Sequence, residues 1–223
     1  MYQALFYKEW IKTRRIIWLA GIIFTGMIIY SFIDMGQAFR VGGAVTTWSN
    51  VLLKDASILP SAIRWVPLLA ALLLAFSQFV PEMVNKRLKL TLHLPLPETN
   101  IMSSMLCYGV AVLFALYLFV YAILLTGLAV YYPCEILMMM TAKSLPWFLG
   151  GLAGYLLAAW VCLEPVWRQR ICNSFIAICA LSLFFLDAPS GAYFPLLGWL
   201  AAIALAAFGF PFYSASHFKE GKQ

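Results

Sequence analysis

The chain has 223 residues, of which 64% are hydrophobic and only 11% are charged, and its mean hydropathy is +0.88. Soluble globular domains carry about a quarter charged residues, so this composition excludes a protein whose whole surface faces water. The net charge at pH 7 is +6, and a single transmembrane domain over 1–223 accounts for the composition.

Six apolar stretches follow one another along the chain, separated by connectors with charges, proline or glycine. An α-helix needs roughly 20 residues to cross the hydrocarbon core of a bilayer, and the stretches do not alternate apolar and polar residues as transmembrane β-strands do. We therefore predict an all-α integral membrane protein with six transmembrane helices at 16–33, 65–80, 101–131, 145–163, 171–186 and 193–213.

The basic residues indicate the orientation of these helices. Eleven of the fifteen lysines and arginines lie before the first stretch, in the connectors 82–100 and 164–170, or after residue 213. Because lysine and arginine accumulate in cytoplasmic loops, both termini are predicted to be cytoplasmic in a multi-pass protein of the cell membrane. Attraction to anionic lipid head groups accounts for the positive charge, and we expect no nucleic-acid partner.

Residues 1–15, ahead of the first stretch, have the pattern of an amphipathic helix. Leu5, Phe6 and Ile11 fall near one side at helical spacing, while charges cover much of the rest. This pattern is typical of a helix that lies in the cytoplasmic interface of the membrane. A simple extension of the first transmembrane helix into water is the alternative.

The long connector 34–64 is predicted to lie on the outer side and to be structured in part. Gly42 and Gly43 are expected to interrupt it, and Pro60 is expected to precede the second transmembrane helix. Between them, we expect a short interfacial helix that packs on the bundle, although a cap over a translocation path is the alternative.

The connector 82–100 is the most informative one. Its leucines share helical faces, and Pro95 and Pro97 would end a helix just before them. A short cytoplasmic helix therefore fits this segment, with Thr99 or Asn100 as the N-cap of the third transmembrane helix. Exposed leucines on such a helix indicate a surface for a partner.

In this order of features the chain resembles the permease subunits of ABC transporters of the type-2 exporter class. The acidic Glu82, a basic pair, a leucine-rich helix and Leu-Pro-Leu-Pro follow one another, and a polar residue then opens the third span. Those permeases have an amphipathic N-terminal helix, six spans with both ends inside, and a coupling helix that docks on a cytoplasmic ATPase. The resemblance assigns this docking to Glu82, Lys86, Arg87, Lys89, Leu90, Thr91, Leu92, His93, Leu94 and Pro95.

The resemblance also implies partners and a substrate path. ATP and Mg would bind to the separate ATPase, and a second permease chain, identical or different, would complete the path. Spans two and five would line it with Ser77, Gln78, Asn173 and Ser174. Such a weakly polar lining indicates a hydrophobic or amphipathic cargo, although hydrogen bonds between helices would account for these residues equally well.

Residue types required for catalysis are scarce. His93 and His217 have no acidic or cysteine partners at metal-ligand spacing, and the sequence has no Gly-rich loop followed by Lys and Ser or Thr for ATP phosphates. We therefore predict that the chain is not itself an enzyme and binds neither a metal nor a cofactor. Two other functions remain open: a membrane scaffold that docks a non-ATPase partner through 82–100, and a permease similar to haem exporters.

Overall fold

The computed structural model describes residues 2–54, 57–84, 97–186 and 192–219. Within these residues every regular element is a helix, and five helices are long and apolar enough to cross a membrane. The predicted all-α class is confirmed, and the long apolar helices fit a multi-pass membrane protein.

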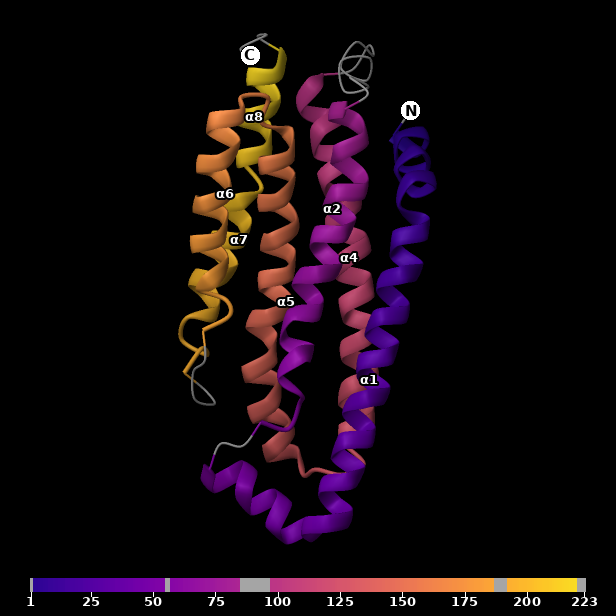
Figure 1. The fold of residues 1–223 in the computed structure, drawn as a ribbon, viewed down its shortest axis with the longest axis vertical. Helices are drawn as coiled ribbons and strands as arrows, with labels where there is room; N and C mark the ends of the chain where they lie inside the picture. The colour runs from indigo at the N-terminus through magenta and orange to yellow at the C-terminus, as the bar shows by residue number, and fades with distance from the viewer. Residues whose placement is uncertain (1, 55–56, 85–96, 187–191, 220–223) are drawn as a thin grey trace.

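The first helix, α1, extends over Tyr2–Lys54 and changes direction at Gly43, whose φ is 71° and ψ 165°. Only glycine adopts this backbone region readily, because it has no Cβ. In Figure 1 the part of α1 after Gly43 lies across the end of the bundle. We call it the outer arm, and it is held there by Trp48, whose indole Nε1 donates to the carbonyl oxygen of Tyr131 at 3.2 Å. The predicted interruption and the helix packed on the bundle are both present.

Residues 1–15 differ from the prediction of a separate interfacial helix. The helix continues from Tyr2 into the first span, and Gly43 is the only residue of α1 with non-helical backbone angles. The physical reason is that the polar side chains of Glu9 and Thr13 are buried in the bundle, with 2% and 0% of their surface exposed. Packing against neighbouring helices, rather than against lipid head groups, therefore orients this segment.

The remaining helices run back and forth along the bundle (Figure 1). They are η1 Ser61–Trp65, α2 Val66–Val84, α4 Glu98–Leu128, α5 Cys134–Leu163, α6 Trp167–Ser182, α7 Leu197–Ala207 and α8 Phe210–Lys219. Figure 1 shows the start of α1, the last turn of α2, the first turn of α4 and the end of α8 at one end of the bundle, which we call the terminal end.

Several helix boundaries differ from the predicted ones. α5 begins at Cys134 rather than near residue 145, since charged residues such as Lys143 continue the helix beyond the apolar stretch. α4 follows directly on Pro97, which has non-helical angles, rather than on a cap at Thr99 or Asn100. The last stretch is divided into α7 and α8, and α6 has only 16 residues.

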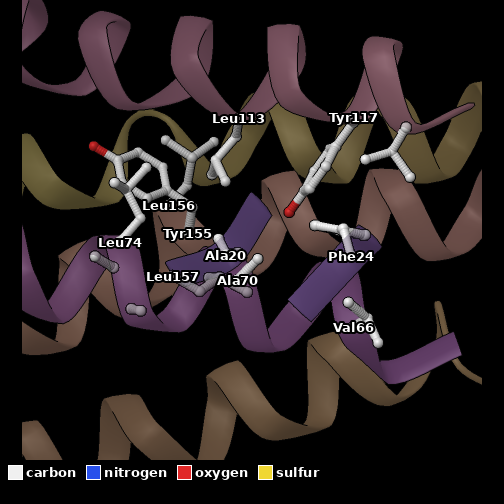
Figure 2. Packing of buried hydrophobic residues seen from close by; sticks show 14 of the residues in the cluster. Ala20, Phe24, Val66, Ala70, Leu74, Leu113, Tyr117, Tyr155, Leu156 and Leu157 are labelled. Atoms are coloured by element: carbon white, nitrogen blue, oxygen red, sulfur yellow. The ribbon is translucent and has the colours of Figure 1, made fainter. Parts of the chain in front are cut away.

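α5 lies at the centre of the bundle, where α2, α6, α7 and α8 all pack against it. Figure 2 shows the small side chains of Ala20 and Ala70 within this core, close to Leu157. Small residues allow helices to approach closely in a membrane. Gly109 is an extreme case, because a Cβ there would lie 2.0 Å from the hydroxyl oxygen of Tyr155.

Candidate functional site

The predicted docking residues fall mainly outside the described part of the chain. Of that set only Glu82 is described; Lys86, Arg87, Lys89, Leu90, Thr91, Leu92, His93, Leu94 and Pro95 all lie within 85–96. The helix ends on either side, Val84 of α2 and Glu98 of α4, are at the terminal end of the bundle (Figure 1).

Glu82 lies in the last turn of α2 and is fully buried. Its Oε1 is 2.8 Å from Nζ of Lys12 and 3.0 Å from Nζ of Lys8. The same Lys12 ammonium is 2.9 Å from Oε1 of Glu9. We call these four residues the ion-pair cluster. The prediction placed Glu82 on a docking surface, whereas its carboxylate is turned inward and contacts α1.

The charges of the ion-pair cluster balance, with two carboxylates against two ammonium groups. Balance is required because an uncompensated buried charge costs several kcal/mol. Glu9 and Glu82 are 2% and 0% exposed, and the Oε2 atom of each accepts no hydrogen bond from the described residues. The two carboxylates and Lys12 therefore hold α1 against α2 with little access to water, whereas Lys8 is more exposed.

Hydrogen bonds extend this contact to two further helices. Thr13 of α1 and Tyr108 of α4 share a hydrogen bond of 2.7 Å between their hydroxyl groups. Gln78 of α2 donates from Nε2 to a backbone carbonyl of α4 at 2.9 Å and accepts at Oε1 from the hydroxyl of Tyr155 in α5 at 2.7 Å. We call Thr13, Tyr108, Gln78 and Tyr155 the polar layer. It joins α1, α2, α4 and α5 near the terminal end.

Gln78 was predicted to line a substrate path, but its amide group makes hydrogen bonds to α4 and α5 instead. Its amide is fully buried and is used in the polar layer. Ser77 beside it is half-buried and donates to the carbonyl of Leu74 in its own helix. On α6, Asn173 is buried and Ser174 donates to the carbonyl of Arg170. Bonding within and between helices therefore accounts for Ser77, Gln78 and Ser174.

A groove of about 390 Å³ runs between α2 and α6, with α5 as its floor. Of the four predicted path residues, Ser174 lines it, and its lining does not include the other three. The groove is lined by Trp65, Leu68, Leu72, Phe76, Gly154, Leu157, Ala158, Val161, Ser174, Ala177, Ile178, Leu181, Ser182 and Phe185.

A third buried carboxylate, outside the ion-pair cluster, lies between α5 and α6. Glu164 is fully buried, and its Oε2 accepts from the hydroxyl of Ser214 in α8 at 2.5 Å. The guanidinium of Arg170 donates to the backbone carbonyl of Glu164 at 2.6 and 3.1 Å. α1 therefore contacts a buried glutamate in the last turn of α2, and α8 contacts a buried glutamate at the C-terminal end of α5.

The ion-pair cluster was not predicted from the sequence. Two local signals were present: Glu9 and Lys12 are three residues apart, and Gln78 and Glu82 are four apart, so each pair shares a helix face. Polar residues repeated on one face of an otherwise apolar helix indicate a buried contact. Glu82 was instead assigned to the predicted docking connector 82–100, after a second span that ended at residue 80.

Metal-ligating side chains do not gather in the described residues, where no group of three or more His, Cys, Asp and Glu could hold an ion. The chain was also compared with protein-family models, with curated proteins and with solved structures. No match was found in any of the three comparisons.

Proposed function

We propose that the chain is the transmembrane permease subunit of an ATP-driven ABC exporter, in which a separate cytoplasmic ATPase supplies the energy. The observation that carries this proposal is the position of the ion-pair cluster. It joins α1 to the last turn of α2, directly before the segment 85–96 that the sequence predicts to dock on the ATPase.

The proposed topology has six membrane crossings and cytoplasmic termini. In its support, the start of α1 and the end of α8 lie at the terminal end of the bundle (Figure 1), where α6 begins with Arg168 and Arg170 in its first turn. α6 supplies the fifth crossing, although its 16 residues span only about 24 Å at 1.5 Å per residue. A short helix is accommodated by local thinning of the bilayer and by side chains that reach to the interface.

In the proposed mechanism, movement of the docked segment is passed to the bundle by rigid contacts. The ATPase would displace the end of α2, and the ion-pair cluster would make α1 follow. The polar layer would carry the same movement to α4 and α5. Buried ion pairs suit this role because separating their partners is costly.

Copurification tests the proposal. The tagged full-length chain, extracted in mild detergent, should bring with it a protein that contains an ATP-binding Gly-rich loop, identified by mass spectrometry. Leu92→Glu should remove that protein, because it places a charge on the predicted docking face. Leu53→Glu is the matched control, since Leu53 is 84% exposed on the outer arm, and it should leave the complex intact.

Two results would contradict the proposal. One is a chain that purifies without any ATP-binding protein. The other is a complex that tolerates Leu92→Glu as well as it tolerates Leu53→Glu. A copurifying partner that lacks an ATP-binding loop would favour the membrane-scaffold function instead.

A further inference from the structure

A second groove, of about 630 Å³, lies between α1 and α4, which run side by side from the terminal end of the bundle (Figure 1). We call it the α1–α4 groove. Apart from two indole rings its side chains are apolar or bear a single hydroxyl, that of Thr25, which donates to the carbonyl oxygen of Gly21 at 2.8 Å. A polar solute would therefore lose its hydration there for little in return, whereas a hydrocarbon chain would lose nothing. The groove is lined by Trp10, Ile17, Trp18, Gly21, Ile22, Thr25, Gly26, Ile28, Ile29, Leu116, Phe119, Val120 and Ile123.

The dimensions of the α1–α4 groove fit one acyl chain of one leaflet. Gly21 and Gly26 keep it hollow, because a Cβ built at either glycine has no described neighbour within 4 Å. From Ile17 to Ile29 the groove follows about 18 Å of α1 at 1.5 Å per residue. That is slightly more than half the 30 Å thickness of the hydrocarbon core. The volume of about 630 Å³ is within the range of specific ligand sites, which is roughly 300–1,000 Å³.

Arg14 lies on the face of α1 that lines the groove, toward the terminal end. It is four residues after Trp10 and four before Trp18, and both tryptophans line the groove. Residues four apart share one face of a helix, so this face continues through Arg14. Tryptophan favours the head-group level of a membrane, and the guanidinium group matches the geometry of a phosphate.

The charge of Arg14 is open to water and has no counter-charge within the described residues. Its side chain is exposed and forms no ion pair or hydrogen bond with them. The carboxylate of Glu9, on the same helix, is paired with Lys12 instead. The segment 85–96, which follows α2, contains no acidic residue. An anionic group from outside the chain can therefore approach Arg14.

We propose that the α1–α4 groove binds one acyl chain of an anionic membrane lipid, with the lipid phosphate at Arg14. The open charge and the apolar interior are complementary to the two parts of such a lipid. A second copy of the chain is a poorer occupant, because a symmetric pair in a membrane has its twofold axis along the membrane normal. The two Arg14 side chains would then meet at the same level and repel each other. The proposal requires only that the helices lie in a membrane, and it does not depend on the transporter function.

Photo-crosslinking tests the head-group preference. The full-length chain is reconstituted in phosphatidylcholine vesicles that contain a trace of phosphatidylglycerol or of phosphatidylcholine with a diazirine on one acyl chain, and labelled peptides are identified by mass spectrometry. Peptides of α1 and α4 that line the groove should be labelled several-fold more by phosphatidylglycerol. Arg14→Gln should abolish this difference, and Arg14→Lys should retain it. Arg168→Gln is the matched control and should leave it unchanged, since Arg168 is an exposed arginine in the first turn of α6 at the same end of the bundle.

Filling the groove tests the acyl-chain site. Gly21→Leu and Gly26→Leu each place a side chain in the groove, so each should remove most of the labelling of its peptides by both lipids. Gly36→Leu is the matched control and should retain the labelling, because a Cβ there also has nothing within 4 Å and Gly36 does not line the groove. Circular dichroism and thermal unfolding check the fold of each variant.

Three results would overturn the proposal. They are equal labelling of the groove by the two lipids, a preference that survives Arg14→Gln, and groove labelling that persists in both filled variants. A wild-type dimer that either filled variant dissociates, without lipid labelling of the groove, would also overturn it and assign the groove to a second copy.

Discussion

Lys12 occupies the central position of the ion-pair cluster, because its ammonium group lies within 3 Å of carboxylate oxygens on both Glu9 and Glu82. Its side chain is 15% exposed, against 37% for Lys8. Water therefore screens the Lys8 contact more strongly than the Lys12 contacts. Two lysines in the same cluster thus make different contributions to the stability of the bundle.

Replacing Lys12 with Met should lower the free energy of unfolding by about 3–5 kcal/mol, because it leaves two buried carboxylates with one cation. Lys8→Met should cost less than about 1 kcal/mol, as for exposed ion pairs. Denaturant unfolding in detergent measures both. Equal losses for the two variants would show that the burial of Lys12 is not what sets the strength of the cluster.

A second prediction concerns the contact of Gly109 with Tyr155. A Cβ at Gly109 would lie 2.2 Å from Cζ of Tyr155, a fully buried residue that cannot move aside easily. Gly109→Ala should therefore destabilise the bundle by about 1–3 kcal/mol through overpacking. Gly21→Ala is the control: a Cβ there has nothing within 4 Å, so the higher helix propensity of alanine should leave stability unchanged or raised.

At the scale of elements, long apolar stretches predicted the helices well, because any segment that crosses a bilayer must satisfy its backbone hydrogen bonds internally. Boundaries were predicted less well. Charged residues such as Glu82 and Lys143 continue a helix beyond the apolar stretch, so charge did not mark its end. The pairing of Lys12 with Glu82 joins residues distant in sequence, and no local pattern specifies which helices become neighbours.

The outer arm provides a prediction at this scale. Gly43 adopts backbone angles that other residues reach only at a cost of about 1–3 kcal/mol. Gly43→Ala should therefore move the arm or straighten the kink, whereas Gly42→Ala should not, since a Cβ at Gly42 makes only ordinary contacts. Double electron–electron resonance measures the change as the distance between spin labels that replace Ile33 and Lys54. An unaltered distance distribution in Gly43→Ala would contradict this role of the glycine.

At the scale of the whole molecule, the first and last helices are both fixed by buried glutamates near the terminal end. Glu82 contacts α1 through lysines, and Glu164 contacts α8 through Ser214. α2 and α5 end, and α4 and α6 begin, at this same end (Figure 1). The basic residues predict that this end faces the cytoplasm, whereas the two glutamate contacts could not be predicted, because they depend on the arrangement of the helices in space.

The proposed orientation predicts which cysteines react from outside the cell. Cys134 is exposed at the start of α5, so a variant with this cysteine alone should react with a membrane-impermeant maleimide in intact cells. A single cysteine in place of Gln3 should react only after the membrane is made permeable. The reverse pattern would show that the termini are outside.

ATP hydrolysis by the complex isolated through the tagged chain tests the central claim most directly. The account predicts that the isolated complex hydrolyses ATP, and that Leu92→Glu removes this activity from the purified sample while Leu53→Glu retains it. A correctly folded chain that purifies without ATP hydrolysis, or activity that is the same with Leu92→Glu, would contradict the account.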